Sequence, residues 1–336
     1  MRVSFIVTPG AWGLTADGLA ALSAAALPGD EVIIVTARGM APVQLAEKPQ
    51  SGAGMRKGGQ RPDAVNWRVM RLGAVPPPFG AVAANAGLAM ASGEAVVFLT
   101  RGARPDPTGM QAARALLARS GADLVVGRFN GVEAWNVPDQ AAALMLEAQP
   151  ARMLFRRSFV QSAGLRWDEG LPWLAGDALH WRACLRAASV AFHDGVMAHV
   201  PGPCGAEPGA EARGAVFALY RDLLAEAGPK AAPALRNWLA RRVGRDLIAL
   251  PLDDYWRYAE AAAPVRLGGD WPAGRGGRAL AALATRPPWQ AVALWQAEAL
   301  WPDHPPAEPP SDWPRPQATS RAIALWRGWR TGSDSA

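Results

Sequence analysis

Short, largely apolar segments separated by a helical segment constrain the fold of this chain most strongly. Val3–Val7 is apolar and ends at a Thr-Pro-Gly turn, Thr15–Leu27 is rich in Ala and Leu, and Glu31–Val35 is again apolar. Strands that are apolar along their whole length are buried on both faces, and a helical crossover joins strands that run parallel. The sequence therefore predicts a β-α-β unit at the start of a mainly parallel sheet that is flanked by helices.

The same alternation continues to about residue 205. Further strands are predicted at Trp67–Leu72, Ala95–Leu99, Asp123–Phe129, Arg152–Phe155, Val190–Phe192 and Val196–Val200. Further helices are predicted at Phe79–Ala91, Thr108–Ser120, Ser158–Ala163 and Asp177–Ala187. A long loop rich in Gly, Pro and basic residues is expected between Arg38 and Asp63, and its Gly52–Gly59 stretch lacks the Gly-Lys-Ser/Thr ending of a phosphate-binding P-loop.

A second region follows a Gly- and Pro-rich linker at Pro201–Gly214. Its pattern is helical throughout, with helices expected at Ala215–Ala227, Pro233–Ile248, Asp253–Ala262, Arg278–Leu283, Trp289–Leu300 and Ser320–Trp329. We therefore predict an α/β domain over residues 1–205 and a helical C-terminal region over residues 206–336.

Composition narrows the classes of function. Of the 336 residues, 50% are hydrophobic and 19% are charged, as in a globular protein, and the net charge is +6. No RNA-binding aromatic motif, zinc finger or basic helix accompanies the positive charge, so nucleic acid is not the expected partner. No apolar run approaches the roughly 20 residues that span a bilayer, and the N-terminus is interpreted as a strand, not a signal peptide. We expect a cytoplasmic protein, with peripheral association at the inner face of the membrane as the alternative.

Two sequence blocks carry a resemblance to a known family. The first, AANAGLAMASGEAVVFL, begins at Ala83 and places an Asn-x-Gly and an Ala-x-Gly-Glu before a strand that ends in Phe-Leu. The second, beginning at Met153, has a basic residue and a helix before Trp167-Asp168, then Gly176-Asp177 and an aromatic-Arg pair. In this order, the blocks resemble the central and acceptor-side segments of family-two glycosyltransferases over about residues 1–200.

This resemblance implies a Rossmann-like GT-A fold and an inverting transfer of sugar from a nucleotide-diphospho-sugar to a glycan or lipid-linked acceptor, as in bacterial polysaccharide biosynthesis. The family holds a divalent cation with an Asp-x-Asp motif after the Phe-Leu strand, but Thr100, Arg101 and Gly102 stand there in this chain. The second strand, which in the family ends in acidic residues, here ends in Thr36-Ala37-Arg38. We therefore predict neither a bound metal nor another cofactor.

Basic side chains could take over the role of the metal that the missing carboxylates would hold. Arginine carries a permanent charge and a fork of donors that matches phosphate, so Arg101 and Arg104 could stabilise the leaving diphosphate, with Arg38 adding charge. The alternative is a decayed site with surface arginines. The residues predicted to bind the donor are Thr8, Pro9, Thr36, Arg38, Asn85, Thr100, Arg101 and Arg104.

On the acceptor side, the resemblance implies that Asp177 is the general base that removes the proton from the acceptor hydroxyl. The structural alternative is that Asp177 only caps the helix that follows it. Trp173 and His180 are predicted to contact the acceptor, since aromatic faces stack on sugar rings and His180 lies about one helical turn after Asp177. His193 and His199 are interpreted as structural residues.

Two other classes of function remain open. The chain could be a catalytically inactive relative of the fold that serves in binding or assembly, with an exposed apolar patch on the helical region as its interface. It could also be a nucleotide-binding transferase of another chemistry. Ligands of open parallel sheets bind beyond the carboxyl ends of the strands, so the location of the site would not distinguish the two transferases. The donor sugar, its base, the acceptor and the oligomeric state are not determined by the sequence.

Overall fold

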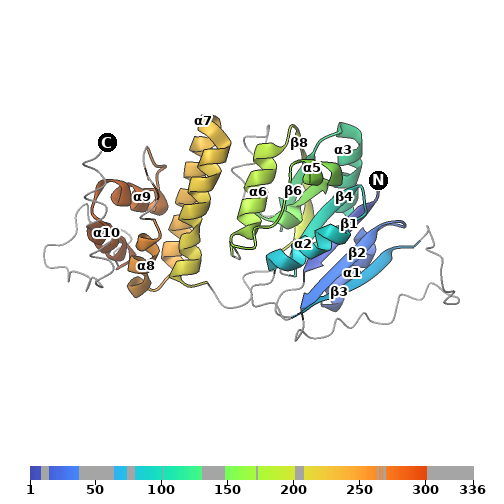
Figure 1. Cartoon of the computed structure of the whole chain (residues 1–336), viewed down its shortest axis with the longest axis horizontal. Coiled ribbons are helices and arrows are strands. Elements are labelled where there is room, and N and C mark those ends of the chain that lie inside the picture. Colours follow the sequence, from blue (N-terminus) through green and yellow to red (C-terminus); the bar gives the residue numbers. More distant parts are fainter. Residues whose placement is uncertain are drawn as a thin grey trace. The chain divides into compact units, whose positions relative to one another are not determined.

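The computed structural model describes residues 1–8, 15–37, 64–73, 80–100, 102–130, 148–171, 173–200, 208–262, 265, 267 and 270–300. The chain divides into two compact units, Met1–Ala206 and Glu207–Ala336, which we describe separately (Figure 1). The expected helix at Ser320–Trp329 and the expected loop from Arg38 to Asp63 lie outside the described residues.

The first unit contains one mixed sheet, with eight strands in its described part, in the order β3-β2-β1-β4-β7-β6-β8-β5. The strands are β1 (Val3–Thr8), β2 (Glu31–Ala37), β3 (Asn66–Leu72), β4 (Ala95–Thr100), β5 (Arg104–Pro105), β6 (Leu124–Phe129), β7 (Met153–Arg156) and β8 (Val190–His199). Four neighbouring strands, β3, β2, β1 and β4, run parallel, and β7 pairs antiparallel with both β4 and β6. The predicted fold class, a mainly parallel sheet flanked by helices, is confirmed.

Two strand predictions are wrong in detail. Val190–Phe192 and Val196–Val200 are parts of one strand, β8, because its pairing with β6 continues past His193–Gly195 through register shifts around Arg128. The two-residue strand β5 was not predicted, since so short a segment has no periodicity, and it pairs antiparallel with the end of β8.

Helices cover both faces of the sheet. They are α1 (Ala16–Ala25), α2 (Gly80–Met90), α3 (Pro107–Ser120), α5 (Arg157–Ser162) and α6 (Ala175–Arg186), with a short 3-10 helix, η1 (Pro150–Arg152), before β7. Thr15 caps α1, because its hydroxyl accepts a hydrogen bond from Gly18 N at 3.1 Å. Asp106 caps α3 in the same way, accepting from Gly109 N at 2.8 Å, and Gly121 ends that helix at a φ of 67°.

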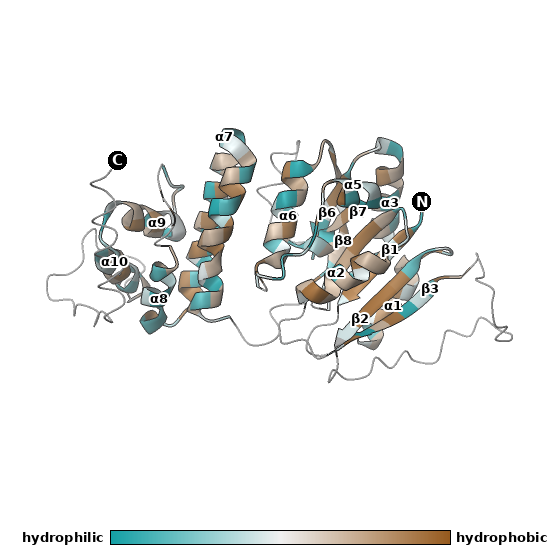
Figure 2. Ribbon diagram, in the orientation of Figure 1, coloured by the Kyte–Doolittle hydropathy of each residue, from teal (hydrophilic) through white to brown (hydrophobic). Residues whose placement is uncertain are grey.

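Alternate side chains of the central strands point to opposite faces, as the pleat of a sheet requires. One face packs residues of β1, β2 and β4 against Leu22 of α1 and against Met110 and Leu117 of α3. The other face packs Ile33 and Val35 against α2. The apolar character of the central strands is visible as brown ribbon in Figure 2.

Glycines allow the covering helices to approach the sheet closely. A Cβ on Gly87 of α2 would lie 2.5 Å from Ile6 Cγ2, and one on Gly109 of α3 would lie 1.7 Å from the carbonyl oxygen of Val196. Gly87 belongs to the Asn-x-Gly block, so that part of the sequence signature has a packing role.

The second unit is helical in its described part. It contains α7 (Ala210–Ala249), η2 (Leu252–Asp254), α8 (Tyr255–Glu260), α9 (Arg275–Thr285) and α10 (Pro288–Leu300). The predicted separation of two helices is confirmed within α7, because Gly228 has non-helical angles with a φ of 66°. The predicted linker is partly wrong, since α7 already begins at Ala210. None of the described helices is long and apolar enough to cross a membrane.

A buried charge cluster joins α7 to α8. Asp246 of α7 is 1% exposed, and its carboxylate accepts hydrogen bonds from Arg213 Nη1 at 2.8 Å and from the Tyr258 hydroxyl at 2.9 Å. Arg242 Nε lies 3.4 Å from the same carboxylate. Burial, followed by the charge of Asp246 and its hydrogen bond, raises the pKa of Tyr258 well above its ordinary value, so this hydroxyl stays protonated and donates.

Candidate donor and acceptor site

Three of the predicted donor-side residues lie at one edge of the sheet. Thr8 ends β1 and stands opposite Thr100, which ends β4, while Thr36 lies next to the end of β2. Thr8 and Thr36 are buried, and the Thr36 hydroxyl donates to the carbonyl oxygen of Met70 at 3.3 Å. The carboxyl ends of parallel strands form the edge at which open α/β sheets bind ligands. The structure therefore brings these threonines to the edge where a nucleotide would be expected.

Arg104 also lies beyond this edge, on β5. Its guanidinium is 45% exposed and pairs with Asp17, in the first turn of α1, at 3.7 Å. An exposed ion pair of this length contributes little energy, so Arg104 can exchange Asp17 for another anion at small cost. Pro9, Arg38, Arg101 and the Gly52–Gly59 stretch lie outside the described residues.

The residues at the turn after β4 do not fit a divalent cation. Thr100 and Gly102 stand where carboxylates would be needed, and Gly102 has a φ of 76°. Within the described part of the chain, no group of three or more His, Cys, Asp or Glu side chains could hold a metal ion.

Asn85 is bonded to protein groups. On α2, its Nδ2 donates to the carbonyl oxygen of Trp167 at 2.9 Å and to Glu169 Oε1 at 2.8 Å, while its Oδ1 accepts from Trp167 N at 2.9 Å. Sequence reasoning selected Asn85 for the donor and did not select Glu169. The local pattern could not indicate this partner segment, because Trp167 lies 82 residues from Asn85 in the sequence.

Asp177 lies in the first turn of α6. The helix begins at Ala175 and its N-cap is Leu174, so the alternative in which Asp177 is the helix cap is wrong. The Asp177 side chain is buried, with 9% of the residue exposed. The preceding residue, Gly176, sits against Pro150 and Trp167, because a Cβ there would lie 3.4 Å and 3.8 Å from their rings. A carboxylate at this position also gains from the positive end of the helix dipole.

The two predicted acceptor contacts differ in exposure. Trp173, just before α6, is half-buried, which is compatible with a contact to a ligand. His180 has no accessible surface, so its burial does not support a direct contact with an acceptor. Further along α6, Cys184 is buried as well, and burial raises the pKa of its thiol to about 12, so this thiol stays protonated near neutral pH.

The histidines of β8 lie beside the cap of α3. His199 Nε2 is 3.6 Å from Asp106 Oδ2, and both side chains are partly exposed. Burial lowers the pKa of His193, although the charges of Asp194 and Asp106 act in the opposite direction. Asp106 is already the cap of α3, which agrees with a structural interpretation of this pair.

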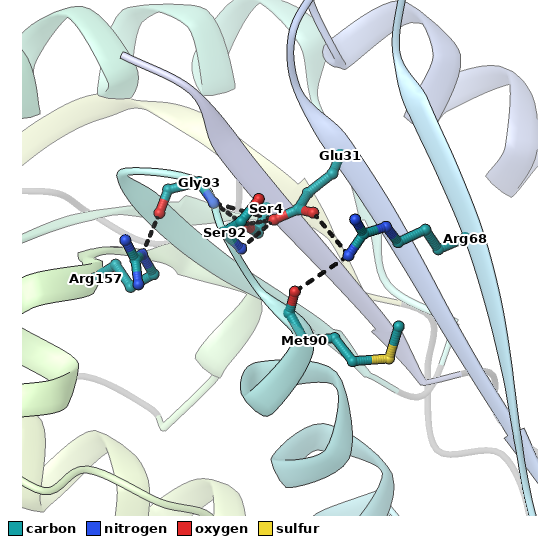
Figure 3. A network of polar contacts seen from close by, with 7 residues as sticks. All are labelled: Ser4, Glu31, Arg68, Met90, Ser92, Gly93 and Arg157. Atoms are coloured by element: carbon teal, nitrogen blue, oxygen red, sulfur yellow. Dashed lines mark hydrogen bonds and ion pairs between the residues drawn. The ribbon is translucent and has the colours of Figure 1, made fainter. Parts of the chain in front are cut away.

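The opposite edge of the sheet carries a polar network that the sequence analysis missed. At the start of β2, Glu31 Oε1 accepts hydrogen bonds from the Ser4 hydroxyl at 2.6 Å, from Gly93 N at 3.0 Å and from Ser92 N (Figure 3). Arg68 Nη1 faces Glu31 Oε2 at 3.6 Å. Burial raises the pKa of Glu31, but these hydrogen bonds outweigh burial and hold it below its usual value of 4.5.

This network explains the glycine in the Gly-Glu of the first sequence block. A Cβ on Gly93 would lie 2.7 Å from the Ser4 hydroxyl oxygen and 2.8 Å from Ser4 N, so a larger residue would disrupt the start of β4. The carbonyl oxygen of Gly93 also accepts a hydrogen bond from Arg157 Nε at 2.6 Å. A glutamate at the start of an apolar strand is the sequence signal that could have indicated the network.

The sheet order and its helical layers define the GT-A glycosyltransferase fold. Comparison of the sequence with protein-family models and with curated proteins finds no match. Comparison of structures finds residues 1–349 of TarS from S. aureus in complex with UDP-GlcNAc, with a TM-score of 0.64, 15% identity and coverage of 89% of this chain and 91% of that chain.

A second similar structure is the mannosyltransferase PcManGT from Pyrobaculum calidifontis, in complex with GDP-Man and Mn²⁺. Its TM-score is 0.50 at 16% identity, and the match covers 90% of this chain and 88% of that chain. At such identities the likeness establishes the fold.

Proposed function

We propose that this chain is an inverting glycosyltransferase that moves a sugar from a nucleotide-diphospho-sugar to a glycan or lipid-linked acceptor. The proposal is supported by the fold and by structural neighbours that were solved with UDP-GlcNAc and GDP-Man. The observation that carries it is the place of Asp177, a buried carboxylate in the first turn of α6, and this turn lies against Trp167 through Gly176.

In the proposed reaction, Asp177 accepts the proton of an acceptor hydroxyl. The hydroxyl oxygen then forms a bond to the anomeric carbon of the donor, on the side opposite the nucleotide. The bond between that carbon and the phosphate oxygen breaks, and the diphosphate leaves with the electron pair. Because the attack is in line, the configuration at the anomeric carbon is inverted.

The negative charge that grows on the diphosphate needs a positive partner. We propose that Arg104 and Arg101 supply it without a divalent metal, with Arg38 as a further cation and the threonines Thr8, Thr36 and Thr100 lining the nucleotide edge. Arg104 fits this role because its present partner, Asp17, is 84% exposed and held at 3.7 Å. Trp173 is proposed to stack on the acceptor sugar.

We further propose that residues 1–205 form the transferase domain of a cytoplasmic enzyme of polysaccharide biosynthesis. A lipid-linked acceptor would place the enzyme at the inner face of the membrane.

A thermal-shift experiment tests donor binding directly. UDP, UDP-GlcNAc and GDP-mannose are added to the full chain, with MnCl₂ in one series and EDTA in the other. A ligand at about 100 times its dissociation constant stabilises the folded state by about 2.7 kcal/mol, which is visible as a raised melting temperature. A shift that persists in EDTA supports the proposal. A shift that needs Mn²⁺ refutes the metal-independent form.

The role of Asp177 is tested by Asp177→Asn, with Asp194→Asn as the control. Asp194 lies on β8 of the same unit and is exposed, so we expect wild-type turnover from Asp194→Asn. We expect Asp177→Asn to abolish turnover with donor affinity unchanged, because an amide cannot accept the proton. If Asp177→Asn keeps wild-type turnover, the assignment of the base is wrong.

The second candidate is a catalytically inactive binding or assembly protein. The loss of both acidic motifs, at Thr36 and at Thr100, favours it. An exposed apolar patch on the helical unit would support it further, but among the described residues of that unit Ile248 is the one large hydrophobic side chain that is exposed. Absence of any shift with all three nucleotides, in Mn²⁺ and in EDTA, would decide for this candidate.

A further inference from the structure

The side-chain amide of Asn85 has no donor group left for a ligand. An amide carries two N–H donors, and those of Asn85 go to the carbonyl oxygen of Trp167 at 2.9 Å and to Glu169 Oε1 at 2.8 Å. Its oxygen accepts from Trp167 N at 2.9 Å, so the amide pairs with both polar groups of one backbone residue. Asn85 therefore fixes the backbone at Trp167, and a phosphate could bind to its N–H groups only by breaking this pairing.

The ring of Trp167 contacts two other elements, so fixing its backbone also fixes these contacts. The residue is 6% exposed, and its ring meets Phe98 of β4 edge to face at 5.4 Å between centroids. On the other side, Trp167 Cζ3 is 3.8 Å from the position of a Cβ on Gly176, the residue before Asp177. One side chain thus connects the strand that ends at Thr100 with the first turn of α6.

A separate attachment holds the same segment to α6. Asp168 Oδ2 pairs with Arg182 Nη1 at 3.1 Å, and Asp168 Oδ1 accepts from Gly170 N at 3.1 Å. The segment from Trp167 to Gly170 is therefore bonded to α2 through Asn85 and to α6 through Asp168.

We propose that Asn85 is a positioning residue that sets the place of Asp177 relative to the carboxyl ends of β1 and β4, and that it is not a ligand of the donor. The catalytic consequence rests on the proposed function, in which Asp177 is the base. Since displacement of a reacting group by about 1 Å can cost about 100-fold in rate, loss of this pairing should lower turnover with little effect on donor binding.

The experiment compares the same substitution at two asparagines of the full chain. Asn85→Asp keeps the acceptor for Trp167 N, removes both N–H donors and places a carboxylate beside Glu169. Asn130→Asp is the matched control, because Asn130 pairs with Val200 in the same way, through Nδ2 to the carbonyl oxygen at 2.9 Å and through Oδ1 from Val200 N at 2.7 Å. Its φ of 53° is one that Asp tolerates.

Three quantities are measured on each variant: hydrogen exchange of the peptide that contains Trp167, the dissociation constant of UDP-GlcNAc and GDP-mannose, and turnover. For Asn85→Asp we expect exchange about tenfold faster in that peptide, turnover lower by at least about tenfold, and a dissociation constant within about threefold of the wild type. For Asn130→Asp we expect the wild-type value of all three.

A double variant distinguishes loss of the Asn85 pairing from general disruption of the fold. In Asn85→Asp with Glu169→Gln, the new amide can donate to the new carboxylate and the charge repulsion is removed, so exchange protection and turnover should both recover in part. Absence of recovery in a folded double variant overturns the proposal.

The inference alone is also overturned by unchanged exchange in Asn85→Asp, or by a dissociation constant raised at least about tenfold, which is the signature of a donor ligand. A wild-type protein that binds neither nucleotide sugar overturns the proposed function, and the catalytic role of Asn85 with it, whatever the exchange result.

Discussion

Replacing Glu31 by Gln tests whether the polar network at the start of the parallel strands stabilises the fold. Glu31 is 4% exposed, and its Oε1 accepts hydrogen bonds from the Ser4 hydroxyl and from the backbone amides of Ser92 and Gly93. Glutamine has the same shape and keeps one acceptor oxygen there. Its amide group then faces the Arg68 guanidinium, which now lies 3.6 Å from Oε2. The substitution thus removes the charge and adds one donor-donor conflict.

The magnitude follows from the number and kind of these bonds. A hydrogen bond to a charged group contributes about 1.5–3 kcal/mol, against about 0.5–1.5 kcal/mol for a neutral one, so each of three bonds weakens by about 1 kcal/mol. The Arg68 side chain is 34% exposed, so its ion pair is screened by solvent and adds little. We expect a loss of about 2–3 kcal/mol, or a fall in melting temperature of about 5–10 °C for a unit of this size.

The assay is urea unfolding at pH 7, followed by circular dichroism, with Glu94→Gln as the matched control. Glu94 also accepts a backbone hydrogen bond, from Arg2 N at 2.8 Å, but its side chain is 60% exposed, so we expect no measurable change. If Glu31→Gln unfolds within about 0.5 kcal/mol of the wild type, the network is not a source of stability and the reasoning fails.

The difference in unfolding free energy between wild type and Glu31→Gln should depend on pH, and the pKa of Glu31 gives the direction of that dependence. The pKa of Glu31 is lower in the folded state than its usual value of 4.5, so its stabilisation is complete above that value and is lost as the pH falls through the folded pKa. The difference in unfolding free energy between wild type and Glu31→Gln should therefore be constant near neutral pH and shrink below about pH 4.5. A difference that grows on acidification would contradict the assignment.

Three further outcomes are expected. Gly276→Ala should destabilise the helical unit by about 3 kcal/mol in calorimetry, because the new Cβ would lie 1.7 Å from the Ala240 carbonyl oxygen; an unchanged melting temperature would contradict the packing. Asp246→Asn should cost about 3–5 kcal/mol in urea unfolding, since Arg213 and Arg242 lose their buried counter-charge. Arg104→Gln should weaken donor binding in titration calorimetry, most at low salt. An effect independent of ionic strength would argue against electrostatic attraction between Arg104 and the diphosphate.

The sequence by itself determined the class of fold and marked the glycines whose packing role the structure then showed. The apolar segments at Val3, Glu31 and Ala95 specify buried strands, because a strand covered on both faces must be apolar on both. The blocks around Gly87 and Gly93 mark places where a helix or a neighbouring strand comes too close for a side chain. Such local requirements are visible in a local pattern.

Only the tertiary structure decided the roles of the polar side chains. Asn85 was selected as a donor ligand, yet its amide pairs with Trp167, 82 residues away. His180 follows Asp177 by one turn, yet it is fully buried, and Asp177 lies inside the first turn of α6 and not at its cap. A hydrogen bond depends on which groups the fold brings within about 3 Å, and burial depends on what packs above a helix face. For that reason the apolar pattern specified the fold, while only the three-dimensional contacts showed which polar side chains are bonded within the protein.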